Sequence, residues 1–217
     1  MLVGAIVLVQ RAQEPLTPRM ASPTSTFDLV ERFKNGDSGA FSQLFRLYHH
    51  RLAISVYYRM SAELRALHEV DDVLQEVFLR ASRDMDHFTY RSPGSLMAWL
   101  LCIADRVIVD SARRENREKR RAEEMLRLRS DSNPTGPEPV DSNTPSRLYA
   151  REETLQLLLK KLDELPVDYR QVILLSKFEG MTTREIAERM GKPRETVALL
   201  LHRAIKRFRE LESERES

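Results

Sequence analysis

The chain is poor in the residues that build disulfide-rich and sheet-rich proteins. Its 217 residues include one cysteine and seven glycines, while 31% are charged and 41% are hydrophobic. One cysteine cannot form an internal disulfide, which excludes a disulfide scaffold and favours a reducing, cytoplasmic location. Cys102 lies inside the apolar stretch Trp99 to Ile103, so we expect it to be a buried structural thiol and not a nucleophile. The composition as a whole favours soluble, strongly helical structure.

The chain also lacks a long apolar run near its amino terminus. Leu2 to Val9 is apolar, but ~20 such residues are needed to cross a membrane, and no basic residue precedes the run as in a signal peptide. Residues 11–25, with three prolines and two serines, show no periodicity. We therefore predict a disordered tail over residues 1–24, with Met20 as an alternative start, and no membrane partner.

A scarcity of basic and large apolar residues divides the chain in two. Between Ser130 and Ser146 there are four of the ten prolines, no lysine or arginine, and Val140 as the only large apolar residue. This composition is typical of a flexible linker, which we place at residues 125–149. The predicted fold is all-α, with two small helical domains at residues 25–124 and 150–213.

The first domain begins with two predicted helices that are separated by Asn35-Gly36, with Asp37 as the N-cap of the second. That second helix carries one apolar stripe at three- and four-residue spacing: Phe41, Leu44, Phe45, Tyr48, Leu52 and Val56. The adjacent His49 and His50 point about 100° apart on a helix and have no cysteine or carboxylate at ligand spacing. We therefore expect solvated histidines and no metal site.

A third predicted helix has an acidic outer face. Its inner stripe consists of Val70, Val73, Leu74, Val77, Phe78 and Ala81. The opposite side gathers Asp71, Asp72, Gln75 and Glu76, here called the acidic patch, next to Leu79. On its own, such a patch is more typical of a solvated helix face than of a binding site.

The next predicted helix combines aromatic and basic residues. A Pro93-Gly94 turn leads to Ser95, the expected N-cap, and the core stripe that follows is Leu96, Leu100, Ile103 and Val107. Phe88, Tyr90 and Trp99 lie near its start, and basic residues follow: Arg106, Arg113, Arg114, Arg117, Lys119, Arg120 and Arg121. Binding an unpaired nucleic-acid strand requires phosphate neutralisation and stacking surfaces together, although such aromatic residues are as often core residues.

The second domain has the pattern of a helix-turn-helix. Gly180 ends one helix, and Thr182 with Glu185 is expected to form a capping box at the start of the next. Gly191 suits the left-handed residue that ends this short helix, and Pro193 fits the first turn of the last helix. Short helix, glycine-containing turn and second helix are the parts of this motif.

The last helix has two different faces. At about 100° per residue, one face collects Val197, Leu200, Leu201, Ala204, Ile205 and Phe208 as core residues. The opposite face carries Glu195, Leu199, His202, Arg203 and Lys206. In a major groove, Leu199 could contact a thymine methyl group and the basic residues could contact phosphates or guanine. The alternative is an exposed leucine without a special role.

Taken together, these segments resemble bacterial RNA polymerase sigma factors of the extracytoplasmic-function (ECF) subfamily over residues 26–213. The marks of the resemblance are, in order, "NGDSGAFSQLFRLYHHRL", "DDVLQEVFLRA", "AWLLCIADRVIVD" with the basic run, and the segment from Leu162 to Phe208. The resemblance implies a sigma region 2 helical bundle followed by a sigma region 4 helix-turn-helix, winged-helix-like. It also implies core RNA polymerase and promoter DNA as partners.

The resemblance implies a role for each surface. The acidic patch would bind the clamp helices of the polymerase's largest subunit. Promoter melting and capture of the minus-ten strand would involve Phe88, Tyr90, Trp99, Arg106, Arg113 and Arg114. The minus-thirty-five element would be read by Arg184, Arg194, Glu195, Thr196, Leu199, His202, Arg203 and Lys206. No catalytic residue, metal or cofactor is implied, no enzyme activity is expected, and an anti-sigma factor is a further candidate partner.

The sequence departs from the family pattern at three sites. Ala198-Leu199-Leu200 stands where Lys-Ser-Arg is common, Asp105-Arg106 replaces Arg-Asn, and Leu96-Met97 replaces Phe-Arg. We expect weaker promoter affinity through the last helix as a result. Two other interpretations remain open: a DNA-binding regulator whose helix-turn-helix acts alone, and a helical adaptor that binds only protein.

Overall fold

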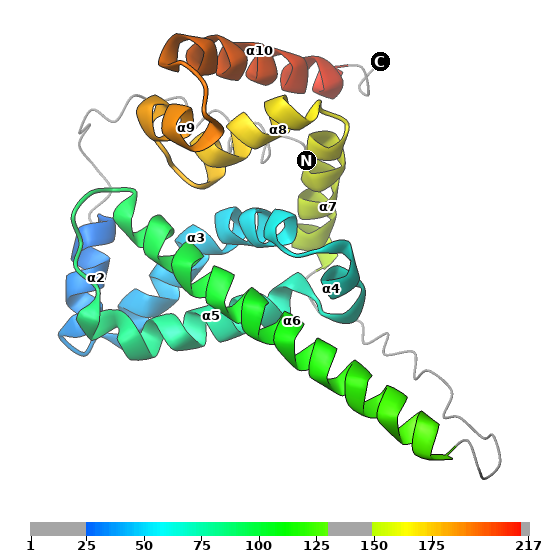
Figure 1. Ribbon diagram of the computed structural model, residues 1–217. Helices are drawn as coiled ribbons and strands as arrows, with labels where there is room; N and C mark the ends of the chain where they lie inside the picture. The colour runs from blue at the N-terminus through cyan, green and yellow to red at the C-terminus, as the bar shows by residue number, and fades with distance from the viewer. Residues whose placement is uncertain (1–24, 130–148, 214–217) are drawn as a thin grey trace.

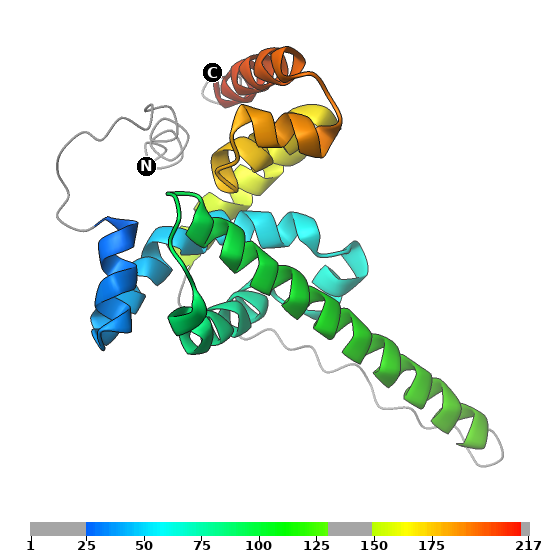
Figure 2. The same cartoon turned by 60° about the vertical axis from the view of Figure 1, so that its left-hand side comes forward.

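The protein is built of helices that form two groups in space (Figure 1). The structure is a computed structural model that describes residues 25–129 and 149–213, and no residue in these ranges belongs to a β-strand. Helices α2 to α6 form the first domain and α7 to α10 form the second, as a second view also shows (Figure 2). The all-α prediction is confirmed. Within the described ranges the second domain has the helices of a winged helix but no β-strands that would form a wing.

In the first domain, side-chain caps fix the starts of helices α2 and α3. Its elements are α2 (Thr26–Lys34), α3 (Ser38–Arg59), α4 (Ala62–Leu67), α5 (Val70–Asp84), the 3₁₀ turn η1 (Met85–His87) and α6 (Ser95–Arg129). Ser25 and Asp28 form a capping box at the start of α2. Asp37 caps α3 as predicted, because its carboxylate accepts hydrogen bonds from the first backbone N–H groups of that helix. Gly36, between the two helices, has a φ of +93°, a left-handed conformation that favours glycine.

The core of the first domain lies between α3, α5 and α6. Its fully buried members include Leu52, Val56, Val77, Ala81 and Met97. The ring of Phe78, on α5, lies 4.4 Å from that of Phe45, on α3, so aromatic contacts join the two helices. Burial of the inner stripe of α5 fixes the rotation of this helix and turns the acidic patch outward.

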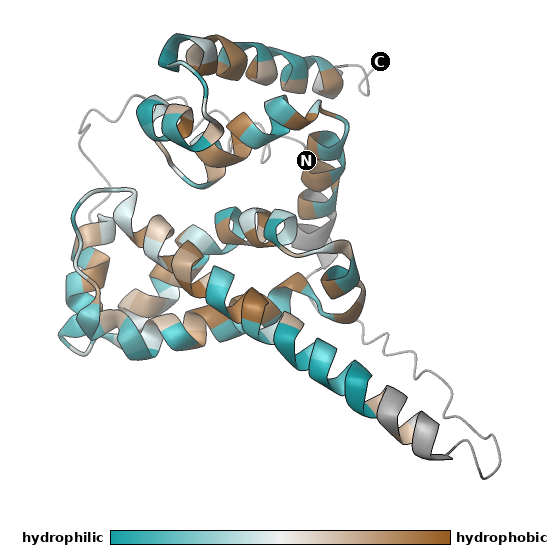
Figure 3. Ribbon diagram, viewed as in Figure 1, coloured by the Kyte–Doolittle hydropathy of each residue, from teal (hydrophilic) through white to brown (hydrophobic). Residues whose placement is uncertain are grey.

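Helix α6 extends beyond this core. Val107 is the last residue of α6 that is buried, among those whose side chains the structure describes. The outer half of the helix is hydrophilic in its described part (Figure 3) and carries the basic run from Arg113 to Arg121. These side chains are therefore presented to solvent on a helix without a core partner along this half.

Two predictions about the start of α6 are wrong. Cys102 is exposed, because a rotation of about 100° per residue turns it away from its buried neighbours Leu101 and Ile103. Because the residues on both sides of Cys102 in the sequence are apolar, the local sequence does not indicate that its side chain points to solvent. Ser95 is the first helical residue and not the N-cap: its hydroxyl accepts a hydrogen bond from the N–H of Ser92 and donates one to the Ser92 carbonyl at 2.7 Å. Its side chain stabilises the preceding turn instead.

The second domain packs its helices around a separate core. Its elements are α7 (Tyr149–Asp163), α8 (Val167–Ile173), the π-helical turn η2 (Leu174–Phe178), α9 (Thr183–Met190) and α10 (Arg194–Ser213). The most completely buried residues include Leu162, Val172, Ile186, Val197 and Phe208. The π-helical turn was not predicted, because the apolar spacing of residues 172–178 is the same as in a continuing α-helix.

The turn of the helix-turn-helix forms largely as predicted. Thr182 and Glu185 make the capping box of α9, and Gly191 ends that helix with a φ of +62°. Pro193 lies immediately before α10, and its carbonyl accepts a hydrogen bond from the N–H of Val197 at 3.0 Å. The proline therefore precedes the first turn and does not lie within it.

The two domains contact each other along α3. Ile54 of α3 is buried in the core of the second domain, and α3 packs against η2 and α7. Helix α6 continues to Arg129, inside the predicted linker, and α7 begins at Tyr149. The predicted tail and residues 130–148 lie outside the described residues. Among the described helices, none has the length and apolar character needed to span a bilayer.

Candidate nucleic-acid and protein interfaces

The acidic patch lies on the outer face of α5, near its N-terminus. Asp72 and Gln75 are exposed, whereas Asp71 and Glu76 are partly exposed. Asp71 Oδ1 lies 3.6 Å from His49 Nε2 of α3. Carboxylates in the first turn interact favourably with the positive end of the helix dipole. The negative charges of Asp71 and Asp72 therefore stabilise the N-terminus of α5, and they remain at or near the protein surface.

Arg80 was not predicted to be part of this surface. Its Nε donates a hydrogen bond to Glu76 Oε1 at 2.7 Å, and its Nη1 donates one to Asp110 Oδ2 of α6 at 3.0 Å. These hydrogen bonds raise the pKa of Arg80. The spacing of four residues between Glu76 and Arg80 was the available signal in the sequence. Since Glu76 is engaged by Arg80, Asp72 is the carboxylate of the patch that is both exposed and directed to solvent.

The two histidines of α3 are less solvated than predicted. His49 is about one-quarter exposed, and its ring lies 4.9 Å from that of Phe45. His49 also lines a cavity of about 400 Å³ together with Leu74 of α5 and Leu159 of α7. The described part of the chain contains no group of three or more histidine, cysteine, aspartate or glutamate side chains that could hold a metal ion.

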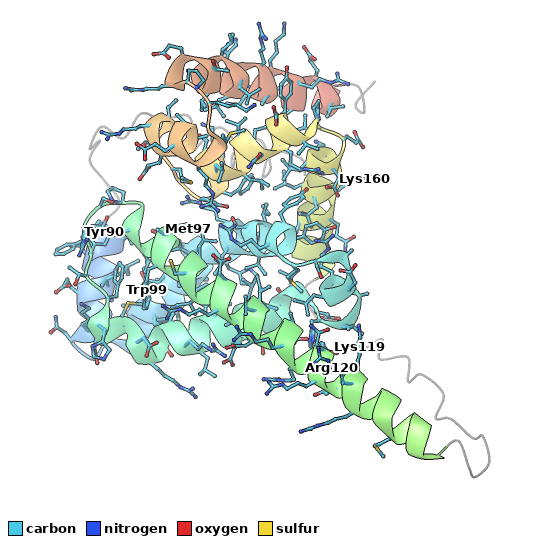
Figure 4. The ribbon with its side chains drawn as sticks, viewed as in Figure 1. Tyr90, Met97, Trp99, Lys119, Arg120 and Lys160 are labelled. Atoms are coloured by element: carbon cyan, nitrogen blue, oxygen red, sulfur yellow. The ribbon has the colours of Figure 1, made fainter. Side chains whose placement is uncertain are left out.

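An aromatic cluster lies where α6 begins, and Figure 4 shows Tyr90 and Trp99 at this end of the domain. Phe88 is only 5% exposed, and its ring lies 4.9 Å from that of Trp99. The Phe88 carbonyl accepts a hydrogen bond from Lys34 Nζ at 2.6 Å. Tyr90 contacts the exposed ring of Phe27 edge to face at 5.5 Å. Phe88 is thus a core residue that supports Trp99, and the accessible ring surface comes from the other three aromatic residues.

The structure brings together some of the residues predicted to bind a strand and separates others. Trp99, Arg106 and Arg113 are spaced by seven residues, so they lie on one face of α6 within about 40°. Arg114 points about 100° away from Arg113. Both arginine positions are exposed, as is Arg106. The Trp99 ring and the guanidinium groups of Arg106 and Arg113 therefore lie in one row along α6.

Two departures from the family pattern have structural explanations on α6. The side chain of Met97 is fully buried, and a charged residue at this position would lose its hydration. Asp105 accepts a hydrogen bond from Arg59 Nε of α3 at 3.0 Å, while its neighbour Arg106 remains exposed. An apolar residue thus fits the first site, and an ion pair occupies the second.

The recognition face of α10 is exposed along its length. Glu195, Leu199, His202 and Lys206 form one stripe, and Leu199 is 50% exposed. Thr196 and Arg203 flank this stripe on one side, and Arg194 begins the helix. The opposite face carries the buried residues Val197, Ala204, Phe208 and Leu211. The two predicted faces of this helix are confirmed.

Helix α9 contributes Arg184 and fixes the turn before α10. Arg184 is exposed and pairs with Glu188 at 3.2 Å. Glu185 Oε2 accepts a hydrogen bond from the N–H of Thr182 at 2.7 Å, and the Thr182 hydrogen bonds lower the pKa of Glu185. Lys192 Nζ, in the turn, lies 3.2 Å from Asp168 Oδ2 of α8. This last contact, which was not predicted, ties the turn to the body of the domain.

Comparison with known proteins gives matches over nearly all of the described chain. The family described as "ECF sigma factor" matches residues 23–213. The ECF RNA polymerase sigma-E factor of Escherichia coli (strain K12) is 29% identical over 180 residues, which cover 81% of this chain and 88% of that protein. The ferric citrate uptake sigma factor FecI of the same strain is 36% identical over 132 residues, which cover 61% of this chain and 69% of that protein.

One similar solved structure is that of CnrH in complex with the cytosolic domain of CnrY. It has 23% sequence identity and a TM-score of 0.41, and the match covers 86% of this chain and 96% of that chain.

Proposed function

Because the chain belongs to the ECF sigma factor family and is therefore an RNA polymerase sigma factor, we propose that its three exposed surfaces divide the work of transcription initiation. The acidic patch on α5 binds core RNA polymerase. The aromatic and basic face of α6 captures the minus-ten strand, and the recognition face of α10 reads the minus-thirty-five element. Sigma factors are initiation factors and not catalysts, and we extend this to a chain without enzyme activity that acts in the cytoplasm.

The chemistry of the acidic patch supports its role in polymerase binding. Asp72 and Gln75 are exposed, and the inner side of α5 is fixed in the core. A rigid helix with outward charges can approach a basic partner without reorganising, and complementary charge speeds the encounter and sets its orientation. Leu79, at 46% exposure, adds apolar contact area next to these charges.

The face of α6 has the features needed to hold an unpaired strand. Trp99 offers a ring that is supported from below by Phe88, and Arg106 and Arg113 continue along the same line. Stacking on an aromatic ring is favourable for any base, and the arginines can neutralise successive phosphates. Unstacking a base costs a few kcal/mol, which these contacts can offset.

The face of α10 has the features needed to read a duplex. A helix-turn-helix places the N-terminal part of its second helix in the major groove. Thr196 and Leu199 lie in that part, and Arg203 and Lys206 lie further along the same exposed side. Short polar and apolar side chains can contact base edges, whereas the longer cations reach phosphates or guanine.

The observation that carries this proposal is the presence of three exposed surfaces of different chemistry on one chain. The acidic patch has no use in a DNA-binding regulator whose helix-turn-helix acts alone, so it provides the test. Asp72→Lys should weaken binding to purified core RNA polymerase at least about tenfold, because it reverses a charge at the centre of the contact. Binding is measured by co-elution in moderate salt, where nonspecific charge attraction is screened.

The matched control is Asp84→Lys, at the other end of the same helix. Asp84 is also exposed, and the substitution makes the same change in charge. It should leave polymerase binding unchanged. Equal binding by the wild type and the Asp72→Lys variant would contradict the assignment of the acidic patch.

A further inference from the structure

Arg59 joins three elements at the boundary between the two domains. Its Nη1 donates a hydrogen bond to Glu179 Oε1 of the second domain at 2.7 Å, and its Nε donates one to Asp105 Oδ1 of α6 at 3.0 Å. The side chains of Arg59 and Glu179 are only 16% and 6% exposed. Burial disfavours the charge on Arg59, but the hydrogen bonds and charges of Glu179 and Asp105 outweigh this and raise its pKa.

Further hydrogen bonds between the domains come from Arg51 and Tyr58, which lie on one face of α3. Arg51 Nε donates a hydrogen bond to the Phe178 carbonyl at 3.1 Å. The Tyr58 hydroxyl lies within hydrogen-bonding distance of the Leu159 carbonyl, at 3.3 Å, and of Asp163 Oδ1, at 3.0 Å. Burial and the bond to Asp163 raise the pKa of Tyr58, so the hydroxyl keeps its proton. These polar contacts surround the buried Ile54 and specify one docked arrangement.

Among these contacts, Arg59 and Glu179 form a pair of oppositely charged, largely buried side chains. The bonds of Arg51 and Tyr58, in contrast, each involve at least one neutral group. Removing either partner of the pair leaves the other as a buried charge without it, which is strongly unfavourable, so loss of Glu179 or Arg59 should loosen the docked form. Arg59 also holds Asp105, the residue next to Arg106 on the face of α6 proposed to receive the strand. The pair therefore links the second domain directly to a DNA-binding surface of the first.

The docked arrangement is too short to read both promoter elements. Their centres are about 25 base pairs apart, or roughly 85 Å at 3.4 Å per base pair. Compact domains of about 100 and about 65 residues are roughly 33 and 28 Å across. Helix α6 extends beyond the first domain, but Arg113, the last residue of the line that starts at Trp99, follows the last described buried residue, Val107, by only about 9 Å of helix. The line on α6 and the face of α10 therefore lie within roughly 70 Å in the docked chain. The faces of α6 and α10 can meet the two elements at once only after the domains separate.

We propose that Arg59 is an intramolecular latch: it holds the two domains together in the free chain, and it is released when the chain engages both promoter elements. The proposal rests on the proposed function for the roles of α6 and α10. The docked chain is the idle form. Its opening is coupled to promoter binding because the faces of α6 and α10 are exposed in both states but can reach the two elements together only when the domains are separated.

The distance between the domains tests the latch in the full-length chain without any partner. One label is attached through Ser42→Cys on α3 and one through Gln171→Cys on α8, in a background that carries Cys102→Ser; both new positions are exposed. Electron-spin resonance should give a short, narrow distance distribution for otherwise unchanged protein. Arg59→Gln should lower the ratio of docked to separated molecules by about tenfold or more, as expected when a buried charge pair is broken.

Two further variants make the result specific. Glu179→Gln removes the same ion pair from the side of the other domain and should shift the distribution in the same direction. The latch can therefore still be tested if one of the two variants fails to fold. Arg32→Gln is the control, because it removes an ion pair of 2.6 Å between Arg32 and Asp37 within the first domain. It should leave the distances unchanged. An unchanged distribution in folded Arg59→Gln and Glu179→Gln would overturn the latch.

The second arm adds core polymerase and then promoter DNA to the labelled wild-type chain. The distribution should move to long distances in the promoter complex, and a short distance that persists there would overturn the proposed release. Failure of the proposed function is a separate result, since the chain would then not bind polymerase while its distances in the free state still responded to Arg59→Gln.

Discussion

The two helices proposed to read DNA, α6 and α10, are built in opposite ways. On α6 the reading line starts from a tryptophan that rests on a buried phenylalanine, and neighbouring carboxylates are engaged by Arg59 and Arg80. On α10 the reading face is a stripe of exposed side chains with Leu199 at its centre. A stacking platform suits an unpaired base, whereas side chains that project from a helix suit the base edges of a groove. The difference predicts that the two helices can be damaged independently.

The substitution with the largest expected effect removes a buried side chain that packs α10 into its domain. Phe208 is 2% exposed and Leu199 is 50% exposed on the same helix. Phe208→Ala should lower the unfolding free energy of the second domain by about 3–5 kcal/mol, whereas Leu199→Ala should change it by less than about 0.5 kcal/mol. Denaturant unfolding followed by circular dichroism measures both. Similar losses for the two variants would mean that the faces of α10 are assigned incorrectly.

A second substitution should damage α6 alone. Trp99→Ala should weaken binding of a single-stranded oligonucleotide by about 1–3 kcal/mol, because one stacking contact is lost. Binding of duplex DNA through α10 should not change. Trp99→Phe is the control, since it keeps a ring over Phe88. Trp99 is the single tryptophan of the chain, so quenching of its fluorescence measures strand binding in the wild type. Equal losses on single strand and duplex would remove the distinction between the two helices.

A smaller effect distinguishes two adjacent arginines of α6. Arg113 lies on the line of Trp99 and Arg106, and Arg114 points about 100° away. Arg113→Ala should reduce the slope of log affinity against log salt for a single strand by about 0.7, the value for one lost phosphate contact. Arg114→Ala, with the same change in charge, should leave the slope nearly unchanged. If Arg114→Ala has the larger effect, the strand follows a different face of the helix.

The smallest expected effect concerns pH and the turn before α10. Hydrogen bonds with Thr182 lower the pKa of Glu185 in the folded chain, so this contribution to stability is present above the unfolded pKa. It is lost as the pH falls through the folded pKa. Because Glu185 is exposed to solvent, Glu185→Gln should remove only a few tenths of a kcal/mol at neutral pH. It should also flatten the acid limb of the stability profile, and an unchanged limb would show that the charge on Glu185 does not contribute.

Local features of the fold could be predicted from the sequence, because they depend on residues close in the chain. The cap at Asp37, the capping box of Thr182 and Glu185, and the two faces of α10 follow from spacing alone. Cys102 was misplaced because the residues beside it in the sequence are apolar, whereas Asp105 and Arg106, one turn later on the same face of α6, are exposed. Phe88 was treated as a strand contact, yet its burial depends on how η1 and α6 meet.

Contacts between distant residues could not be predicted in the same way. Arg59 and Glu179 are 120 residues apart in the chain, and nothing in the spacing of either segment indicates that they pair. The engagement of Asp105 by Arg59 likewise depends on how α3 packs against α6. Such contacts decide how the two DNA-binding surfaces are placed, so this part of the candidate site required the structure.

The most direct measurement is selection of binding sites from randomised duplex DNA by the full chain together with core RNA polymerase. We predict two conserved segments, one for each reading helix, with centres about 25 base pairs apart, the separation of the minus-ten and minus-thirty-five elements. Trp99→Ala should weaken selection of the downstream segment, and Arg203→Ala should weaken selection of the upstream segment. A single conserved segment, selected equally well without polymerase, would contradict the division of work between α6 and α10.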